Sequence, residues 1–121
     1  MMVIGNLTLD AFKEAYVEAA LWSSTDDKGV PLDKDHGPHE IAPETLAQMC
    51  EDCRQFQAAN GALIAADVVR AGHDFWLTRQ HHGAGYWDGD WPEEIGEKLT
   101  EAAHAFGEFD LYVGDDGLIY H

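Results

Sequence analysis

The chain has 121 residues, a hydrophobic fraction of 45% and a formal net charge of −16, from 23 acidic residues against 7 Lys and Arg. This length fits one domain, and the apolar fraction is large enough for a core, which argues against intrinsic disorder. The charge repels nucleic-acid phosphates and anionic lipids, and no segment approaches the ~20 apolar residues of a membrane span, so direct nucleic-acid and membrane binding are not expected.

The N-terminal part of the chain predicts one helix followed by a long loop. Thr8 is a suitable capping residue, and apolar positions at helical spacing continue from there to Ser23 and Ser24. These positions are Leu9, Phe12, Tyr16, Ala19 and Ala20. Residues 24–41 are acidic and are interrupted by Pro31, Gly37 and Pro38, so we expect a long acidic loop that is either functional or mobile.

A second, long helix is predicted from Pro43 to about Arg70. Proline is tolerated in the first helical turn, and Gly72 is well placed to end the helix. The apolar residues keep a helical rhythm over this stretch: Leu46, Met49, Cys50, Cys53, Phe56, Leu63 and Ile64.

The pattern changes after Gly72. Residues 73–79 are rich in aromatic and β-compatible side chains, residues 80–83 can turn, and residues 84–88 can return as a second strand. A third helix follows, with Asp90 as its cap, Glu93 completing a capping box, and Gly107 at its end. Residues 109–113 and 118–120 predict a terminal hairpin in which Leu111 and Val113 share one face.

These elements predict a single acidic α+β domain over residues 1–121. About three helices pack on a small antiparallel sheet that is built from two hairpins, in the order helix, helix, hairpin, helix, hairpin. The tight turn of the terminal hairpin requires a positive φ at Gly117.

Several stretches of the chain resemble a family of small uncharacterised bacteriophage and prophage proteins. The matching stretches are AGHDFWLTR at 71–79, HGAGYWD at 82–88, LTEAA at 99–103, DLYVGDDG at 110–117 and, nearer the N-terminus, ALWSSTD at 20–26. The resemblance implies a phage or mobile-element origin and a host-cytoplasm setting. It implies no biochemical activity.

Cys50 and Cys53 form a C-x-x-C inside the predicted second helix. A redox-active pair needs a preceding strand and a helix N-terminus, whereas Glu51 and Asp52 would raise the thiol pKa. We therefore expect two reduced cysteines, at least one of them buried. The N-terminus has no pattern of a secretory signal, and a reducing cytoplasm is the expected compartment.

Catalytic motifs are weak throughout the sequence. Two histidines and a carboxylate near the predicted central hairpin, His73, His82 and Asp88, are candidates for a divalent metal site. However, His81 and His82 are adjacent and would point to opposite faces of a strand. No H-E-x-x-H, P-loop, G-x-G-x-x-G or G-x-S-x-G pattern is present. We therefore expect no catalytic residue, no bound metal and no cofactor.

The acidic charge has two interpretations. It either keeps the protein soluble or attracts a protein partner with a basic surface. We favour a non-enzymatic phage accessory protein, monomer or homodimer, which acts by protein–protein contact. In a sharper form it inhibits a host defence or nucleic-acid enzyme, with carboxylates in place of phosphates. The alternative is a small metal-dependent hydrolase that uses the His/Asp cluster. The candidate contact residues are Asp26, Asp27, Asp33, Asp35, Trp87, Asp88, Asp90, Trp91, Glu93 and Glu94.

Overall fold

A computed structural model describes residues 2–121. Its elements in chain order are β1 (Met2–Ile4), β2 (Leu7–Leu9), α1 (Ala11–Ser23), α2 (Leu32–Asp35), the 3-10 turn η1 (Pro38–Glu40), α3 (Pro43–Ile64), α4 (Val68–Arg79), α5 (Glu93–His104), β3 (Tyr112–Val113) and β4 (Ile119–Tyr120). The described residues thus mix helices with two small antiparallel sheets. The α+β class is confirmed, but there are more helices than the predicted three.

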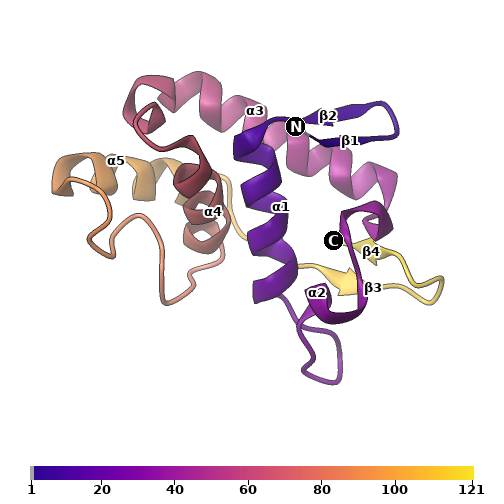
Figure 1. Cartoon of the computed structure of the whole chain (residues 1–121). Helices are drawn as coiled ribbons and strands as arrows, with labels where there is room; N and C mark the ends of the chain where they lie inside the picture. The colour runs from indigo at the N-terminus through magenta and orange to yellow at the C-terminus, as the bar shows by residue number, and fades with distance from the viewer. Residues whose placement is uncertain (1) are drawn as a thin grey trace.

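The centre of the fold is the pair of helices α1 and α4, which pack side by side, with α5 on one side of the pair and the two small sheets on the other (Figure 1). Asp10 caps α1, since its carboxylate accepts from the backbone N–H of Lys13 at 2.9 Å. The predicted cap, Thr8, lies in β2 instead. Gly72 of α4 meets the backbone of Phe12 in α1, and a Cβ at this position would overlap the carbonyl oxygen of Phe12. Glycine is therefore required for the close approach of the two helices.

The predicted central hairpin is wrong. Residues 73–79 belong to α4, and residues 80–92 form an irregular loop without a strand. The reason lies in the burial of α4, whose residues are buried on almost every side over its last nine positions. A helix that is buried on nearly all sides lacks the one-sided apolar periodicity by which helices are recognised, and its aromatic residues then suggest a strand.

Two helix boundaries also differ from expectation. The second helix ends at Ile64 and not near Arg70, because Asp67 caps a new helix by accepting from the backbone N–H of Arg70 at 3.0 Å. Gly72, expected as a C-terminal cap, therefore lies inside α4. Asp90 does not cap the last helix, which begins after Pro92 without a side-chain cap.

The terminal hairpin is confirmed. Tyr112 pairs with Tyr120 and Val113 with Ile119, and Gly117 has a φ of 83°. Leu111 is buried while Tyr112 is exposed, as the alternation predicts. The hairpin does not share a sheet with any other, because β1 and β2 form a separate N-terminal hairpin that the sequence pattern did not indicate.

The acidic loop of residues 24–41 is more ordered than expected. It contains α2 and η1, and Leu32 of α2 is buried in the core. The loop ends at Ile41, which bridges to Ile119 of β4, and the N–H of Ala42 donates to the Ile119 carbonyl at 2.8 Å.

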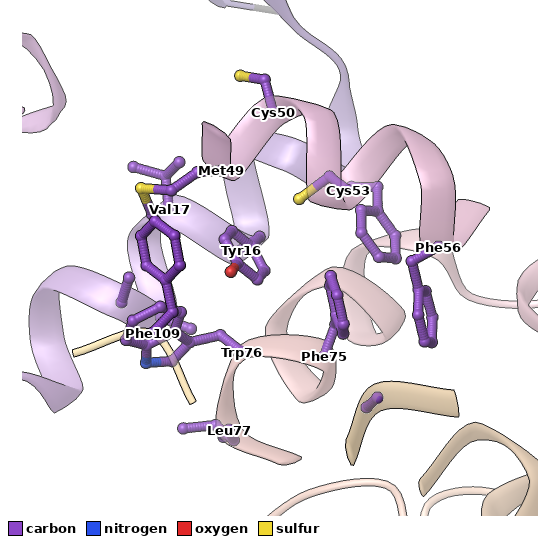
Figure 2. Packing of buried hydrophobic residues seen from close by; sticks show 14 of the residues in the cluster. Tyr16, Val17, Met49, Cys50, Cys53, Phe56, Phe75, Trp76, Leu77 and Phe109 are labelled. Atoms are coloured by element: carbon purple, nitrogen blue, oxygen red, sulfur yellow. The ribbon is translucent and has the colours of Figure 1, made fainter. Parts of the chain in front are cut away.

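Aromatic rings fill the core between α1, α3 and α4. Phe56 and Phe75 stack with ring centroids 4.2 Å apart, and Tyr16 packs against Phe75 at 5.1 Å. Cys53 points from α3 into the space between Tyr16 and Phe75, whereas Cys50 points away from those rings (Figure 2). Both cysteines are buried and free, as predicted.

A buried arginine at the end of α4 links this helix to α1, to α3 and to the segment after α5. The Arg79 guanidinium donates to the Asp52 carboxylate at 2.9 Å, to the Tyr16 hydroxyl at 2.9 Å, and to the carbonyls of Gly107 and Phe106 at 2.8 and 3.1 Å. Four acceptors satisfy the planar donor fork, which a lysine cannot imitate. Arg79 is thus part of the core and does not contribute to the charge of the surface.

Candidate protein-interaction site

The loop that follows α4 is fixed to that helix by Tyr86. The Tyr86 hydroxyl donates to the Ala71 carbonyl at 2.6 Å, and the Tyr86 backbone N–H donates to the Thr78 hydroxyl at 3.1 Å. Ala71 and Thr78 lie two turns apart on α4, and all three residues are buried. Tyr86 therefore lies along two turns of α4 and holds the middle of the loop in one position.

Trp91 provides a second attachment. Its indole Nε1–H donates to the Asp74 carboxylate at 2.8 Å, and its ring meets the Tyr86 ring edge-on at a centroid distance of 5.7 Å. Asp74 is only 2% exposed, and burial raises the pKa of its carboxyl group. A buried carboxylate is costly unless it is hydrogen-bonded, and Asp74 has two partners, the Trp91 N–H and, at 3.5 Å, the Nδ1 of His73.

Trp87 is turned outward between these two anchors. Its side chain is 46% exposed, although its neighbour Tyr86 is buried. A Cβ on Gly85 would lie 2.6 Å from the Trp87 ring, which shows that the indole lies directly over the glycine backbone. The Asp88 carboxylate accepts from the Gly85 N–H at 3.3 Å and closes this turn of the loop. The exposed indole is consequently held by its surroundings and does not project freely.

A half-open groove of about 610 Å³ separates this loop from α5. Tyr86, Trp87 and Trp91 line it from the loop. From α5 it is lined by Glu93, Gly96, Glu97, Thr100 and Glu101. A Cβ on Gly96 would lie 2.6 Å from the Tyr86 carbonyl oxygen, so a glycine is needed where the loop approaches the helix.

Three glutamates form one wall of the groove. Glu93, Glu97 and Glu101 are four residues apart, which places them on one face of α5 at intervals of ~6 Å. All three are exposed, and none forms an ion pair with a Lys, Arg or His within residues 2–121. The groove therefore combines an aromatic floor with a row of unpaired negative charges.

The structure gathers only part of the predicted contact residues at this groove. Trp87, Trp91 and Glu93 line it, and Asp88, Asp90 and Glu94 are exposed beside them in the chain. Asp90 is engaged with Arg70 in an ion pair of 2.9 Å. Glu97 and Glu101 were not among the candidates, although the spacing of four residues from Glu93 was a readable signal.

The other predicted contact residues lie elsewhere. Asp26 shapes a turn, because its carboxylate accepts from the backbone N–H groups of Lys28 and Val30, and these bonds lower its pKa. Asp27 lies beside it on the same loop, and Asp33 and Asp35 are exposed on α2. These four residues do not line the groove of α5.

The three metal candidates do not form a metal site. His73 stacks on Trp22 at a ring distance of 5.6 Å, and His82 meets the same indole edge-on at 6.0 Å. Asp88 instead binds the Gly85 amide. Within residues 2–121, no group of three or more His, Cys, Asp or Glu side chains is arranged to hold a metal ion.

The C-x-x-C pair shows no sign of redox chemistry. Both thiols lie along the middle of α3, away from the end of the helix. Burial raises the pKa of the Cys50 thiol and raises that of Cys53 well above its ordinary value. A raised thiol pKa disfavours the reactive thiolate.

The acidic excess of the composition lies almost entirely on the surface of the protein. Within residues 2–121, which include all 23 acidic side chains and all 7 Lys and Arg, only Asp52, Asp74 and Arg79 are buried. The remaining surface carries 21 acids against six Lys and Arg.

Comparisons with protein-family models, with curated proteins and with solved structures gave no match to this chain. In the region that the structure covers, 2–121, no helix combines the length and the apolar character that a membrane crossing requires.

Proposed function

We propose that this chain is a small non-enzymatic accessory protein that acts by binding a protein with a basic surface. The groove between the 86–91 loop and α5 carries the proposal, because it offers an exposed indole beside three glutamates that have no Lys, Arg or His partner among residues 2–121. Exposed aromatic residues are frequent anchors of protein interfaces, and a surrounding field of one sign accelerates encounter with a partner of the opposite sign.

The sharper form of this proposal is a phage-encoded inhibitor of a host defence or nucleic-acid enzyme. The 21 surface carboxylates would then occupy a basic groove in place of nucleic-acid phosphates. The resemblance of five stretches of the chain to phage and prophage proteins supports this origin and a partner in the host cytoplasm. Two of these stretches pack on each other, since Trp22 and Ser23 of α1 contact His73 and Trp76 of α4.

The alternative, a metal-dependent hydrolase, is not supported by a specific observation. It required His73, His82 and Asp88 to converge in a cleft. The two histidines both contact the Trp22 ring, whereas the Asp88 carboxylate accepts a hydrogen bond from the Gly85 N–H. The protein-binding function is therefore the one that we propose.

Affinity capture from a nuclease-treated bacterial lysate tests the proposal. A matrix that carries polyglutamate at the same charge density serves as control for unspecific ion exchange. We expect proteins that are retained by this protein but not by polyglutamate, that have a basic nucleic-acid-binding surface, and that are released by double-stranded DNA. Retained proteins that stay bound when DNA is added at equal charge would contradict the nucleic-acid-enzyme form. Retention identical on the two matrices would contradict specific binding altogether.

A further inference from the structure

The chemistry of the groove specifies its occupant. The wall of Glu93, Glu97 and Glu101 requires positive charge, and the indole of Trp87 offers a flat aromatic surface next to it. A guanidinium group satisfies both, because it is planar, stacks on aromatic rings and binds carboxylates through paired N–H donors. An ammonium group supplies the charge but neither the plane nor the paired donors.

The spacing of the wall specifies how the charges of the occupant are arranged. Successive glutamates lie ~6 Å apart along α5, since four helical residues rise by that distance. In an extended peptide, side chains on one face repeat every second residue, a distance of ~6.6 Å. An extended segment with arginine at alternate positions therefore presents one guanidinium to each glutamate over the whole length of the wall.

The groove is already formed in the free protein. Tyr86 is held by Ala71 and Thr78, and Trp91 is held by Asp74. Binding therefore does not have to order the loop, which lowers the entropic cost of association.

From these observations we propose that the groove binds an extended segment of the partner protein in which arginines alternate with small residues, with one guanidinium stacked on Trp87 and ion-paired with Glu97. This inference rests on the proposed function and identifies the part of the partner that this groove recognises.

Titration calorimetry of the whole chain with short capped peptides at low salt tests the proposal. The probes are Arg-Ser-Arg-Ser-Arg, the clustered isomer Arg-Arg-Arg-Ser-Ser and the lysine version of the alternating peptide. All three carry the same charge, so a diffuse acidic field binds them equally. We expect the alternating arginine peptide to bind at least threefold more tightly than either of the others. Equal affinity for the three peptides would overturn the proposal.

Matched variants place the peptide on the groove. Trp87→Ala should weaken binding of the alternating peptide by about threefold to thirtyfold, the range of a cation–π contact from exposed to desolvated. Glu97→Gln removes an exposed ion pair and should weaken binding by about 1.4-fold to fivefold. Glu44 is an exposed glutamate at the start of α3, away from the groove. Glu44→Gln removes the same charge and should lower the affinity less than half as much as Glu97→Gln does. An equal loss in Glu44→Gln and Glu97→Gln would overturn the groove as the binding site. The lysate capture tests the proposed function separately, because it detects a basic partner of the whole protein and does not depend on which peptide the groove prefers.

Discussion

The indole N–H of Trp91 donates a 2.8 Å hydrogen bond to the carboxylate of Asp74, seventeen positions earlier in the chain and buried in the middle of α4. This contact, together with the bonds of Tyr86 to Ala71 and Thr78, fixes the loop that presents Trp87. The core helix thus determines the shape of the proposed interaction groove.

Asp74 should be replaceable by asparagine but not by alanine. Asparagine keeps an acceptor for the Trp91 N–H and removes a buried charge, so Asp74→Asn should be as stable as the wild type or more stable at pH 7. Asp74→Ala leaves the buried indole N–H without an acceptor and should cost about 1–3 kcal/mol. Urea unfolding followed by circular dichroism gives both values. A larger loss for asparagine than for alanine would contradict the role of the bond.

The same carboxyl group should also give a pH signature. Burial raises the pKa of Asp74 in the folded state above the unfolded value of about 3.9. The folded state therefore binds the proton more tightly, and the stability that this proton contributes is lost as pH rises through the raised pKa. Relative to Asp74→Asn, the wild type should become less stable as pH rises from about 3.9 through that pKa. A difference between the two proteins that is constant with pH would contradict the shift.

Gly72→Ala should strongly destabilise the protein. The new methyl group would overlap the carbonyl oxygen of Phe12, so α1 and α4 must move apart at a cost of at least ~1–3 kcal/mol. Gly61→Ala is the matched control, because Gly61 lies in α3 with open space around it and alanine there should stabilise by ~0.4–1 kcal/mol. Thermal unfolding of the two variants should therefore shift in opposite directions. A tolerated alanine at position 72 would show that the helices are packed less closely than described.

The buried pair of Arg79 and Asp52 should behave as a unit. Arg79→Leu leaves the Asp52 carboxylate buried without its cation and should cost about 3–5 kcal/mol. Arg79→Leu combined with Asp52→Leu removes both charges and should be less damaging than the single arginine variant. A double-mutant cycle by urea denaturation measures the coupling. Additive losses in the double variant would mean that the two side chains do not depend on each other.

The two cysteines should be alkylated more slowly in the folded protein than in the unfolded protein. Cys50 and Cys53 are buried and burial raises both thiol pKa values, so labelling by iodoacetamide in native buffer should be slow and should become rapid in denaturant. Of the two, Cys50 should react first in the folded state, since its sulfur points away from the aromatic core (Figure 2). Rapid native labelling of both would contradict the packing of α3.

Local patterns predicted the parts of the fold in which one face is buried. The stripe of α1, the first turn of α3 at Pro43 and the Gly117 turn of the terminal hairpin all follow from residues close together in sequence. The helix α4 could not be recognised in the same way, because its burial on nearly all sides depends on α1, α3 and the 80–92 loop. The N-terminal hairpin consists of two three-residue strands, which are too short to show alternation.

The candidate site was predicted in its components but not in its arrangement. Trp87, Trp91 and Glu93 were expected at a contact surface, and the groove includes all three. The role of Asp74 could not be predicted from the sequence. A buried carboxylate can be recognised only together with its hydrogen-bond donor, and the donor, Trp91, is seventeen positions away and outside the predicted hairpin of residues 73–88. The assumption of that hairpin placed His73, His82 and Asp88 together, whereas the helix and loop direct the histidines to Trp22.

The proposed function requires the 21 surface carboxylates to act together as one negative field. Mutual repulsion between them opposes folding, and sodium chloride screens it over a Debye length that falls from ~30 Å at 0.01 M to ~8 Å at 0.15 M. The most direct measurement is the melting temperature at pH 7 across this range of salt. The melting temperature should rise steadily with salt, and association with a basic partner should become slower over the same range. A melting temperature that does not change with salt would contradict the proposed function, because the carboxylates would then be too far apart or too well paired to attract a partner as one surface.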